Sequence, residues 1–486
     1  MTNAVRDIQS YDIVVVGGGP VGLWLAAESR LGGARVLLLE RRPERVAQSR
    51  ALTLHGRTVE TFALRGLAER FLAVGQPMST GHFAGLDTRL DFAGFDSPYP
   101  FALFIPQSRT EAILEEHALK LGVEIRRGVQ VAGVAERADG VEVELAHGTA
   151  IRAAWVVGAD GARSLVRRSA GIEFAGLPAT DSIAMGDVIL DLPPGPPIAG
   201  GSNEHGGASI LPSGDGMHSR VIVLDTARRH LPQSEPLSLE ELRESLRRTT
   251  GRDFGMRDAT WLTRFTDETR LAASYRQGRL LLAGDAAHIH APMGGQGLNV
   301  GVQDAMNLGW KLALVVTGRA PEILLDTYES ERRPVGERLF TNTVAQYRLV
   351  SGFEPANTHL RAVISDLLAV PEANRAMAGE VSGFAVTYPA ALLPDVPTGE
   401  LAGARTPDLT LDDGSSLHAR LASGRFLRVS VPGQEQLPMP DSLATAPIDD
   451  AAICTPDAGL LAGAGSTIVR PDGYLLATRP VAGRDR

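Results

Sequence analysis

Cysteine is almost absent from this 486-residue chain, whose only example is Cys454. One cysteine excludes an intrachain disulfide and a zinc cluster built from several cysteines, and it fits a reducing compartment. Long hydrophobic runs are also lacking, since no stretch approaches the roughly 18 apolar residues that a membrane span needs. The first apolar run, residues 13–16, is too short for the core of a signal peptide. We therefore expect a cytoplasmic protein that does not cross a membrane.

Positive charge is not in excess, because 48 Lys and Arg residues stand against 57 Asp and Glu residues, a net charge of −9. This balance makes the chain a poor candidate for binding nucleic acids or anionic membranes, and we expect neither as a partner. Hydrophobic residues make up 44% of the chain and charged residues 22%, as in ordinary globular proteins. At about 150 residues per domain, the length predicts two to four domains.

The N-terminal 40 residues predict a βαβ unit. Residues 11–16 (YDIVVV) form a continuous apolar run, typical of a strand buried on both faces. A glycine-rich turn at 17–22 leads into an apolar helical stretch that stops at Gly32-Gly33. A second buried strand follows at 35–40. This order is that of a Rossmann-like dinucleotide site.

The turn has the spacing Gly17-x-Gly19-x-x-Gly22. In such a site the first glycine permits the tight turn, the second lets the backbone approach a diphosphate, and the third allows close helix–strand packing. Pro20 and Val21 open the helix, whose N-terminus favours phosphate. Glu40 ends the second strand, where its carboxylate can accept hydrogen bonds from a ribose. The alternative is a glycine-rich turn that binds nothing, and the motif alone does not separate FAD from NAD.

The rest of the chain mixes helices and short strands. A helix is expected over 108–121, with Ser108 as its N-cap, and an antiparallel meander over the three alternating runs 129–135, 141–146 and 149–157. The further expectations are a Pro/Gly-rich break at 192–197, a buried strand at 279–285, helices at 298–316 and at 321–350 with an interruption near Pro334, a Pro-rich linker at 389–408, and a strand and turn at 466–474.

Two later motifs identify the nucleotide. Asp160-Gly161 follows an apolar strand, and Gly284-Asp285 follows another. A glycine-rich loop then runs from Pro292 to Asn299. With the first turn, these motifs resemble, in the same order, those of the group A flavoprotein monooxygenases, the para-hydroxybenzoate-hydroxylase-like family. The resemblance spans roughly residues 11–350.

The resemblance is strongest to the aromatic-polyketide hydroxylases. The shared segments are residues 57–60 with 65–67, 106–108, 307–311, 328–332 and 470–473. It implies an α/β fold: a discontinuous Rossmann-like FAD-binding domain (1–80, 100–175 and 271–390), an inserted mixed-sheet substrate domain (81–99 and 176–270), and a small thioredoxin-like C-terminal domain (396–486). Such a domain lacks redox cysteines in this family, and here it looks shortened.

The resemblance also assigns the cofactor site. It implies that Asp285 bonds the ribityl chain of FAD and that the helix beginning near Leu298 directs its positive end at the flavin. Asp160 would have a structural, NADPH-related role; a strand-end turn paired with Arg163 or Arg167 is the alternative. The full set expected at the cofactor is Gly17, Gly19, Pro20, Val21, Gly22, Glu40, Arg41, Arg50, Gln107, Val131, Asp160, Asp285, Pro292, Gly295, Gly297, Leu298 and Asn299.

Three of these residues have a simpler interpretation that does not involve the cofactor. Gln107 would form a hydrogen bond at the start of a helix, and Arg50 and Arg41 would be solvated surface cations. His288 and His290 suggest a metal, but no third ligand accompanies them at helical spacing, and a loop beside the flavin is the better interpretation. We expect no bound metal. Without a second nucleotide motif, NADPH or NADH is expected to react while lying transiently against the flavin.

The implied activity is an FAD-dependent, NAD(P)H- and O2-consuming monooxygenase that hydroxylates a polycyclic aromatic, polyketide-type phenol through a C4a-hydroperoxyflavin. The flavin carries the chemistry, so no catalytic residue is expected. Met185, Asp187, Ile210, Pro212 and Met217 are the expected pocket residues. We expect a monomer or homodimer.

Three alternatives stay open at this point. The first is a Baeyer–Villiger or epoxidising monooxygenase on a related polyketide. The second is an NAD-linked dehydrogenase, and the third is a non-catalytic flavin-binding accessory protein.

Overall fold

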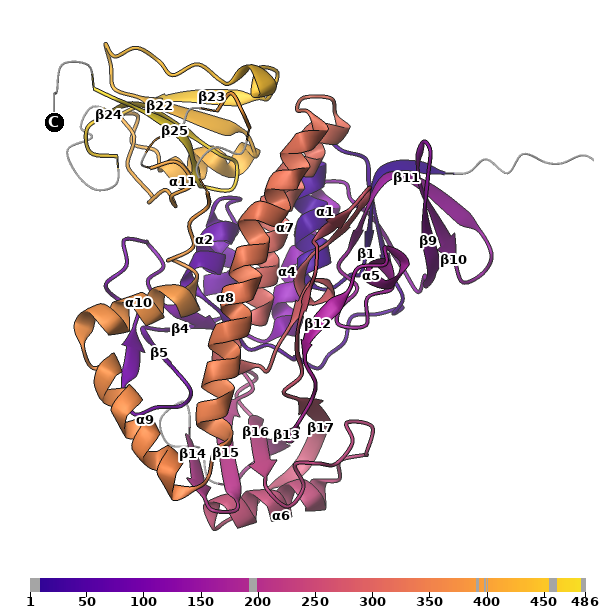
Figure 1. Ribbon diagram of the computed structural model, residues 1–486, viewed down its shortest axis with the longest axis vertical. Coiled ribbons are helices and arrows are strands. Elements are labelled where there is room, and N and C mark those ends of the chain that lie inside the picture. Colours follow the sequence, from indigo (N-terminus) through magenta and orange to yellow (C-terminus); the bar gives the residue numbers. More distant parts are fainter. Residues whose placement is uncertain are drawn as a thin grey trace, which may run out of the picture.

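The computed structural model describes residues 9–191, 199–389, 393–396, 399, 401–453 and 461–481. The break expected at 192–197 lies outside the described residues, as do parts of the linker expected at 389–408. In Figure 1 the described chain forms three bodies along one axis: a central α/β body, a smaller sheet with one helix below it, and a C-terminal sheet above it. None of the helices in the described ranges is long and apolar enough to cross a bilayer.

The central body is built on an eight-stranded sheet. Its strands, in spatial order, are β19 (Arg276–Gln277), β20 (Leu280–Leu282), β11 (Ala150–Gly158), β1 (Ser10–Val16), β2 (Val36–Glu40) and β8 (Glu124–Arg127), with β10 (Gly140–Leu145) paired to β11 and β9 (Val131–Arg137) paired to β10. The run from β20 to β8 is parallel, whereas β9, β10 and β11 form the expected antiparallel meander. The predicted βαβ unit is confirmed, with α1 (Pro20–Leu31) between β1 and β2.

Burial explains why these segments form a central sheet. Ile13, Val14 and Val15 are fully inaccessible to solvent, as expected of a parallel strand covered on both faces. Helix α1 contacts both α4 (Gln107–Lys120) and α7 (Gly297–Val316), and α5 (Leu165–Ser169) contacts β9. The three helices α1, α4 and α7 lie beside one another in Figure 1.

Ser108 does not cap the helix that it was expected to begin. Helix α4 starts at Gln107, and its N-cap residue Pro106 makes no side-chain cap bond; in the first turn, the Ser108 N–H donates to the Ser49 hydroxyl at 3.1 Å. The Ser108 hydroxyl instead accepts a hydrogen bond from the Ser49 hydroxyl at 3.1 Å. The first helical residue is tied to the neighbouring segment, because the Gln107 N–H donates to the Ala51 carbonyl at 3.0 Å and the Ala51 N–H donates to Gln107 Oε1 at 3.1 Å.

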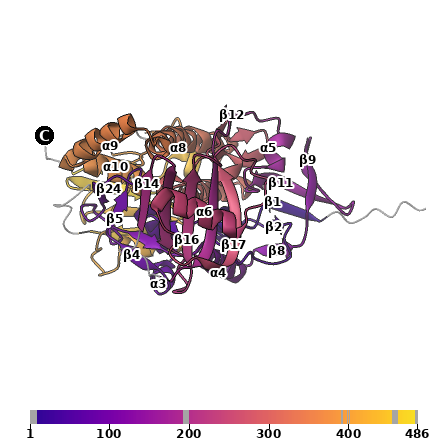
Figure 2. The ribbon, with the colours of Figure 1, turned by 90° about the horizontal axis from the view of Figure 1, so that it is seen from below.

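A second sheet carries the strands β14 (Ala199–Asn203), β15 (Gly206–Pro212), β16 (Ser219–Asp225), β13 (Ser182–Ile189) and β17 (Arg257–Thr266), in that spatial order. All its neighbours are antiparallel. Helix α6 (Leu239–Thr250) covers one face of this sheet and lies in front of it in the view of Figure 2. The other face is directed back toward the central body.

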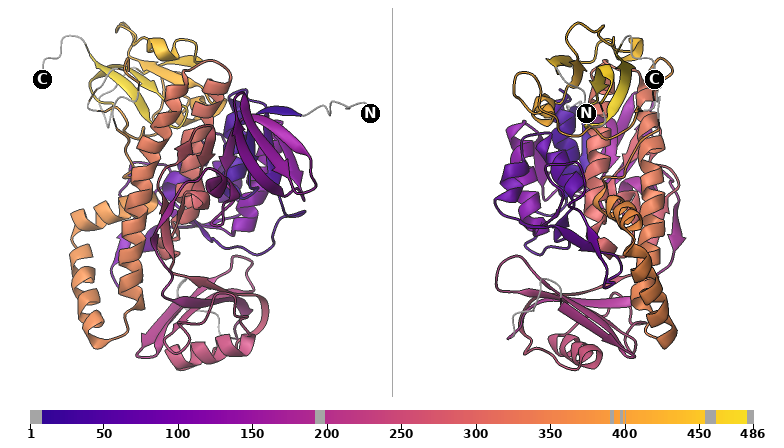
Figure 3. Two further views of the ribbon diagram at one scale, coloured as in Figure 1. Left: turned by 45° about the vertical axis from the view of Figure 1, so that its right-hand side comes forward. Right: turned by 90° about the vertical axis from the view of Figure 1, so that its left-hand side faces the viewer.

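A long helix, α8 (Asp326–Ser351), runs beside both of these sheets, as the two views of Figure 3 show. The interruption predicted near Pro334 is wrong, because the helix continues through the proline. A proline inside a helix removes one backbone hydrogen bond. Here the preceding turn is held by side chains, since Glu331 and Arg332 are buried and paired.

Small elements complete the central region. They are β3 (Thr53–Leu54), β4 (Gln76–Met78), β5 (Thr80–His82), β6 (Arg89–Asp91), β7 (Ala102–Phe104), β12 (Phe174–Leu177), β18 (Thr269–Ala272), β21 (His288–Ile289), α2 (Gly56–Ala63), α3 (Ala68–Leu72), α9 (Pro355–Leu368) and α10 (Pro371–Ser382). Helices α9 and α10 follow α8 and cover the β5–β6 ribbon.

The C-terminal body is a four-stranded sheet in the order β23 (Ile448–Ala452), β22 (Phe426–Ser430), β24 (Ala464–Val469) and β25 (Leu475–Pro480). Strands β22 and β23 are parallel, and the other pairs are antiparallel. Short α11 (Leu417–Arg420) precedes β22. The strand and turn predicted at 466–474 are confirmed.

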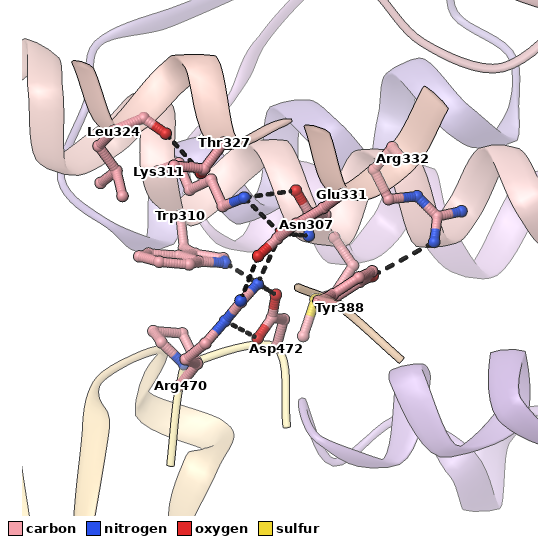
Figure 4. Close-up of polar contacts among 12 residues, drawn as sticks. Asn307, Trp310, Lys311, Leu324, Thr327, Glu331, Arg332, Tyr388, Arg470 and Asp472 are labelled. Atoms are coloured by element: carbon pink, nitrogen blue, oxygen red, sulfur yellow. Dashed lines mark hydrogen bonds and ion pairs between the residues drawn. The ribbon is translucent and has the colours of Figure 1, made fainter. Parts of the chain in front are cut away.

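A buried ionic network joins this C-terminal body to α7 and α8, as Figure 4 shows. Arg470, in the turn after β24, pairs with Glu331 of α8 (Nη1–Oε1 2.5 Å) and with Asp472 (Nη2–Oδ2 2.6 Å). Lys311 of α7 donates to the same Glu331 (Nζ–Oε2 2.6 Å), and Trp310 donates its indole N–H to Asp472. The charges of this network compensate one another, which is the condition for burying them.

The network sets the pKa of Glu331. Burial alone would raise this pKa, but the charges of Arg470 and Lys311 outweigh burial and lower it to about 2. The unfolded chain therefore takes up a proton at a higher pH than the folded chain does. The stability that Glu331 contributes is present above its ordinary pKa and is lost as the pH falls toward 2.

Candidate functional site

Three motifs distant in the sequence meet at one edge of the central sheet. The Ala159 N–H, next to Asp160, donates to the carbonyl of Val16 at 2.8 Å. The Ala283 N–H, next to the Gly284-Asp285 pair, donates to the carbonyl of Gly158 at 3.0 Å. Since β1, β11 and β20 are parallel, their carboxyl ends lie side by side, which is where ligands bind in open α/β sheets.

Each of the three motif glycines in the first turn is required, or not required, for a different physical reason. Gly17 adopts φ +113°, and a Cβ there would lie 2.2 Å from the Ala159 carbonyl oxygen. A Cβ at Gly22 would lie 2.0 Å from the Gly17 carbonyl oxygen. At Gly19 the backbone is ordinary (φ −77°), and a Cβ would have no protein atom within 4 Å. The protein itself therefore does not require a glycine at 19, whereas a diphosphate approaching the start of α1 does.

Glu40 is held beside this turn by the backbone. Its Oε2 accepts from the Gly18 N–H at 2.7 Å and its Oε1 from the Arg42 N–H at 2.9 Å. A Cβ at Gly18 would lie 2.8 Å from the Glu40 Cβ, so this glycine allows the approach. The sequence pattern missed Gly18, because the usual motif spacing skips that position. Each carboxylate oxygen keeps acceptor capacity for a ribose hydroxyl.

Asp285 lies on the opposite side of the same edge, in the one-turn helix η1 (Gly284–Ala286) that follows β20. Part of the Asp285 residue is exposed to solvent, but its carboxylate lies largely among protein atoms. This desolvation raises the pKa of Asp285, although nearby His288 and Arg50 act to lower it. Among the described residues, none donates a hydrogen bond to this carboxylate. It is therefore available to a ligand hydroxyl.

The loop after Asp285 leads into α7. Gly294 and Gly295 both take left-handed φ angles, +65° and +64°. No side chain caps the N-terminus of α7, which starts at Gly297, so its first N–H groups lack intrahelical partners and carry partial positive charge. Pro292 is exposed at the start of the loop, and Leu298 is half-buried in the first turn.

Asn299 holds this loop in place and does not present its amide to a ligand. Its Nδ2 donates to the carbonyls of Gly295 (2.7 Å) and Thr53 (3.1 Å), and its Oδ1 accepts from the His55 N–H (2.7 Å). Its geometry indicates a role in positioning the helix start.

Asp304 is a site residue whose place the sequence did not reveal. From the second turn of α7, its Oδ2 accepts from the Gly284 N–H (3.2 Å) and from His288 Nε2 (2.8 Å), and its Oδ1 accepts from Arg332 of α8 (2.7 Å). This fully buried carboxylate fixes the turn that presents Asp285. The sequence showed Asp304 following the Gly284-Asp285 and glycine-rich loop motif, as the only acidic residue of the helix, but not these contacts.

Arg50 and Gln107 lie on adjoining segments. Gln107 bonds Ala51 through its backbone N–H and its side-chain Oε1, so it supports the loop that carries Arg50. The Arg50 side chain is exposed, and its carbonyl accepts from Arg220 (2.9 Å). Arg220 also pairs with Asp187 through two bonds of 2.8 Å. The second sheet thus contacts the Arg50 loop directly.

The remaining predicted positions surround this centre. Pro20 and Val21 open α1, and a Cβ at Gly284 would lie 3.0 Å from the Val21 side chain. Val131 is buried at the start of β9, whereas Arg41 is exposed after β2.

Asp160 forms neither of the ion pairs considered for it. Its Oδ2 instead accepts from the N–H groups of Leu165 (2.7 Å) and Val166 (3.3 Å) and so caps α5.

His288 and His290, which suggested a metal, are engaged within the protein. His288 bonds Asp304, and His290 lies beside the Ala291 carbonyl at 2.6 Å. Burial lowers the pKa of His290 to about 4, so this imidazole is neutral at physiological pH.

The face of the second sheet opposite α6 is directed at the loop before α7. Ile183, Leu224, Ala291 and Tyr347 form one buried apolar cluster, and Ile222, Phe265, Met293 and Phe353 pack against it. Strand register places Met185 beside Ile222 and Asp187 beside Arg220 on this same face. An apolar, partly aromatic face thus lies against the loop that starts at Asp285.

Two of the expected pocket residues are misplaced. Ile210 is on the opposite face, in the cluster beneath α6 with Val221 and Leu242. Alternation along β15 decides this, because a one-residue offset exchanges the two faces of a strand. Met217 is 66% exposed in the turn between β15 and β16. Pro212 is half-buried at the end of β15, and Met185 is almost buried on the face that borders the loop.

These observations fit an FAD-type dinucleotide. The open space at Gly19 suits a diphosphate, Glu40 suits a ribose, and the unpaired carboxylate of Asp285 suits a polyol chain. The uncapped start of α7 suits an electron-rich ring edge.

Comparison with known proteins agrees with this fit. The model of the FAD binding domain family matches residues 10–343. The uncharacterized aromatic compound monooxygenase YhjG of Bacillus subtilis is 45% identical over 432 residues, covering 87% of this chain and 86% of that protein. A 12-dehydrotetracycline 5-monooxygenase/anhydrotetracycline 6-monooxygenase of Streptomyces rimosus is 42% identical over 507 residues, covering 98% and 97%.

A solved structure extends the likeness to the fold. OxyS, an anhydrotetracycline hydroxylase from Streptomyces rimosus, superposes with a TM-score of 0.87 at 40% identity, covering 97% of this chain and 96% of that one. The family match and these relatives show that the chain belongs to the FAD binding domain family and is a group A flavoprotein monooxygenase of the para-hydroxybenzoate-hydroxylase-like class.

Proposed function

We propose that this enzyme hydroxylates a polycyclic aromatic, polyketide-type phenol, using FAD, NAD(P)H and O2. The observation that carries the proposal is the apolar face of Ile183, Met185, Ile222 and Phe265 opposite the loop that joins Asp285 to α7. Relatives named for tetracycline-type substrates share almost the whole chain, which supports a fused aromatic substrate.

Each part of the chain has a physical task in this proposal. Gly17 and Gly22 shape the turn, Gly19 leaves room for the diphosphate, and Glu40 and Asp285 would hold the ribose and the ribityl chain of the cofactor. The start of α7 stabilises negative charge on the flavin ring. FAD, when bound, supplies hydride acceptance and oxygen activation, so the protein contributes binding, orientation and the exclusion of water.

The remaining cofactor contacts are part of the same proposal. Pro20, Val21, Gln107, Val131, Pro292, Gly295, Gly297, Leu298 and Asn299 line or support the cradle, and Asp160 fixes the turn beside it. Arg50 and Arg41 are exposed cations at its edge.

We also propose three domains along the chain. Residues 1–80, 100–175 and 271–390 would bind FAD, residues 81–99 and 176–270 would bind the substrate, and residues 396–486 would form a shortened thioredoxin-like domain. The order β25-β24-β22-β23, with one parallel pair, supports the last assignment. A monomer or homodimer in the cytoplasm completes the proposal.

The experiment has two stages. The purified protein is incubated with FAD and desalted, and its absorption spectrum is recorded; a colourless protein refutes the cofactor assignment. NADPH and NADH oxidation is then measured with and without anthraquinone- or angucycline-like phenols, with Asp285→Ala as the matched control. If no phenol stimulates oxidation, the substrate class is wrong.

The product distinguishes hydroxylation from Baeyer–Villiger insertion or epoxidation. All three reactions add one oxygen atom, so mass alone does not separate them. NMR of the isolated product shows whether the new oxygen is on an aromatic carbon, within a ring, or in an epoxide. An inserted ring oxygen would contradict hydroxylation and leave the cofactor site unaffected.

A further inference from the structure

His55 is a buried residue that the proposed chemistry does not use. It follows β3, serves as the N-cap residue of α2, and is 3% exposed. Its backbone N–H donates to Asn299, and its ring Nε2 lies 2.7 Å from the Gly294 carbonyl oxygen. Its other ring nitrogen, Nδ1, is buried and has no hydrogen-bond partner among the described residues.

These contacts define the protonation state of the His55 ring. A carbonyl oxygen only accepts, so the proton must be on Nε2 and Nδ1 must be unprotonated. A second proton on Nδ1 would be buried without an acceptor, which is unfavourable. Burial accordingly lowers the pKa of His55 to about 4. The ring is a neutral, one-donor group that faces the flavin loop.

The accepting carbonyl occupies a sensitive place. Gly294 and Gly295 are both left-handed, so the peptide between them has backbone freedom that other residues lack. Because a trans peptide is planar, its carbonyl and its N–H point in opposite directions. The bond from His55 to the Gly294 carbonyl therefore also directs the Gly295 N–H away from His55. That peptide lies two residues before the first turn of α7.

We propose that His55 is a positioning residue that fixes the orientation of the Gly294–Gly295 peptide and so presets the start of α7 for the flavin ring. The inference rests on the proposed FAD site. His55 acts on the backbone of the loop, on the opposite side of the peptide from the Gly295 N–H. A side chain that keeps an N–H at the same place is expected to replace it, and one that lacks an N–H is not.

The test compares His55→Leu with His55→Gln. The leucine variant removes the donor, and the loop peptide becomes free to rotate; the dissociation constant for FAD is expected to rise about tenfold. The glutamine variant can place an amide N–H on the carbonyl and is expected to restore most of the affinity. Affinity is measured by flavin fluorescence titration, and the reduction potential of bound FAD is measured alongside.

His117→Leu is the matched control. His117 is a half-buried histidine whose pKa burial lowers to about 4, so it is neutral like His55; it is stacked on Trp24 at a centroid distance of 5.8 Å and lies near the end of α4. Its loss is expected to lower the melting temperature without changing FAD affinity or potential.

Each outcome decides the inference. A wild-type protein that binds no FAD overturns the proposed function and this inference together. A wild-type protein that binds FAD, with a leucine variant of equal affinity and potential, overturns the role of His55 alone. If leucine and glutamine variants lose affinity equally and in parallel with their melting temperatures, His55 is only structural. Loss in the leucine variant with recovery in the glutamine variant supports the proposal.

Discussion

Two glycines separated by one residue should respond in opposite ways to the same added methyl group. At Gly17 the left-handed φ and the 2.2 Å approach to the Ala159 carbonyl both oppose a Cβ. We expect Gly17→Ala to lower the free energy of unfolding by about 2–5 kcal/mol. The melting temperature should fall by several degrees, at about 2–4 °C per kcal/mol.

Gly19→Ala should leave the fold almost unchanged. Its φ is ordinary and the added Cβ meets no protein atom within 4 Å. The N-cap preference for glycine over alanine and the reduced entropy of the unfolded chain oppose each other, so the net change should stay within about 1 kcal/mol. The methyl group would instead occupy the approach of the diphosphate. Losing one charge-assisted hydrogen bond there weakens FAD binding about ten- to a hundredfold.

The assay measures both quantities on the same samples. Apoprotein melting gives the stability, and quenching of FAD fluorescence gives the affinity. Gly201→Ala, in the second sheet, is the control, because its Cβ would make only ordinary contacts, the nearest at 3.7 Å from Thr250. If Gly19→Ala binds FAD as tightly as the wild type, the diphosphate does not lie at this turn and the reasoning fails.

The other predictions concern the flavin carboxylate, the ionic network and the substrate face. Asp285→Ala should raise the dissociation constant for FAD about ten- to a hundredfold, whereas Asp285→Asn, which can still accept, should lose less; fluorescence titration measures both. Arg470→Met removes one of the two cations paired with buried Glu331, so the free energy of unfolding measured by chemical denaturation should fall by about 3–5 kcal/mol. Removing a cation from a solvent-exposed ion pair would change it much less. Because the pKa of Glu331 is lowered to about 2 in the folded chain, wild-type stability should decline as the pH falls from about 4.5 toward 2, and Glu331→Gln should flatten this part of the pH profile. Phe265→Ala should raise the KM for a stimulating phenol while the FAD spectrum stays unchanged; an unchanged KM would remove this side chain from the substrate face.

Local patterns were sufficient for the elements that form the proposed nucleotide site. A strand, a glycine turn, a helix and a second strand within 40 residues are short-range features, and the physical requirements of a diphosphate limit which residues can occupy the turn. The two acidic motifs also follow buried strands directly, so parallel pairing alone brings them to one edge. For these elements the prediction from sequence was correct because each one depends on neighbours within a few residues.

Only the tertiary structure decided the supporting residues. Asp304, His55 and Gly18 act through contacts with segments 16 to 244 residues away, and no local pattern carries that information. The same limit explains the errors at Ile210, where the strand face depends on pairing register, and at Pro334, where buried ion pairs on the preceding turn keep the helix continuous. The sequence determined which chemistry the chain can hold, because that chemistry needs particular residue types in particular turns. Packing determined which side chains hold those turns in place, because burial and pairing are properties of the folded chain alone.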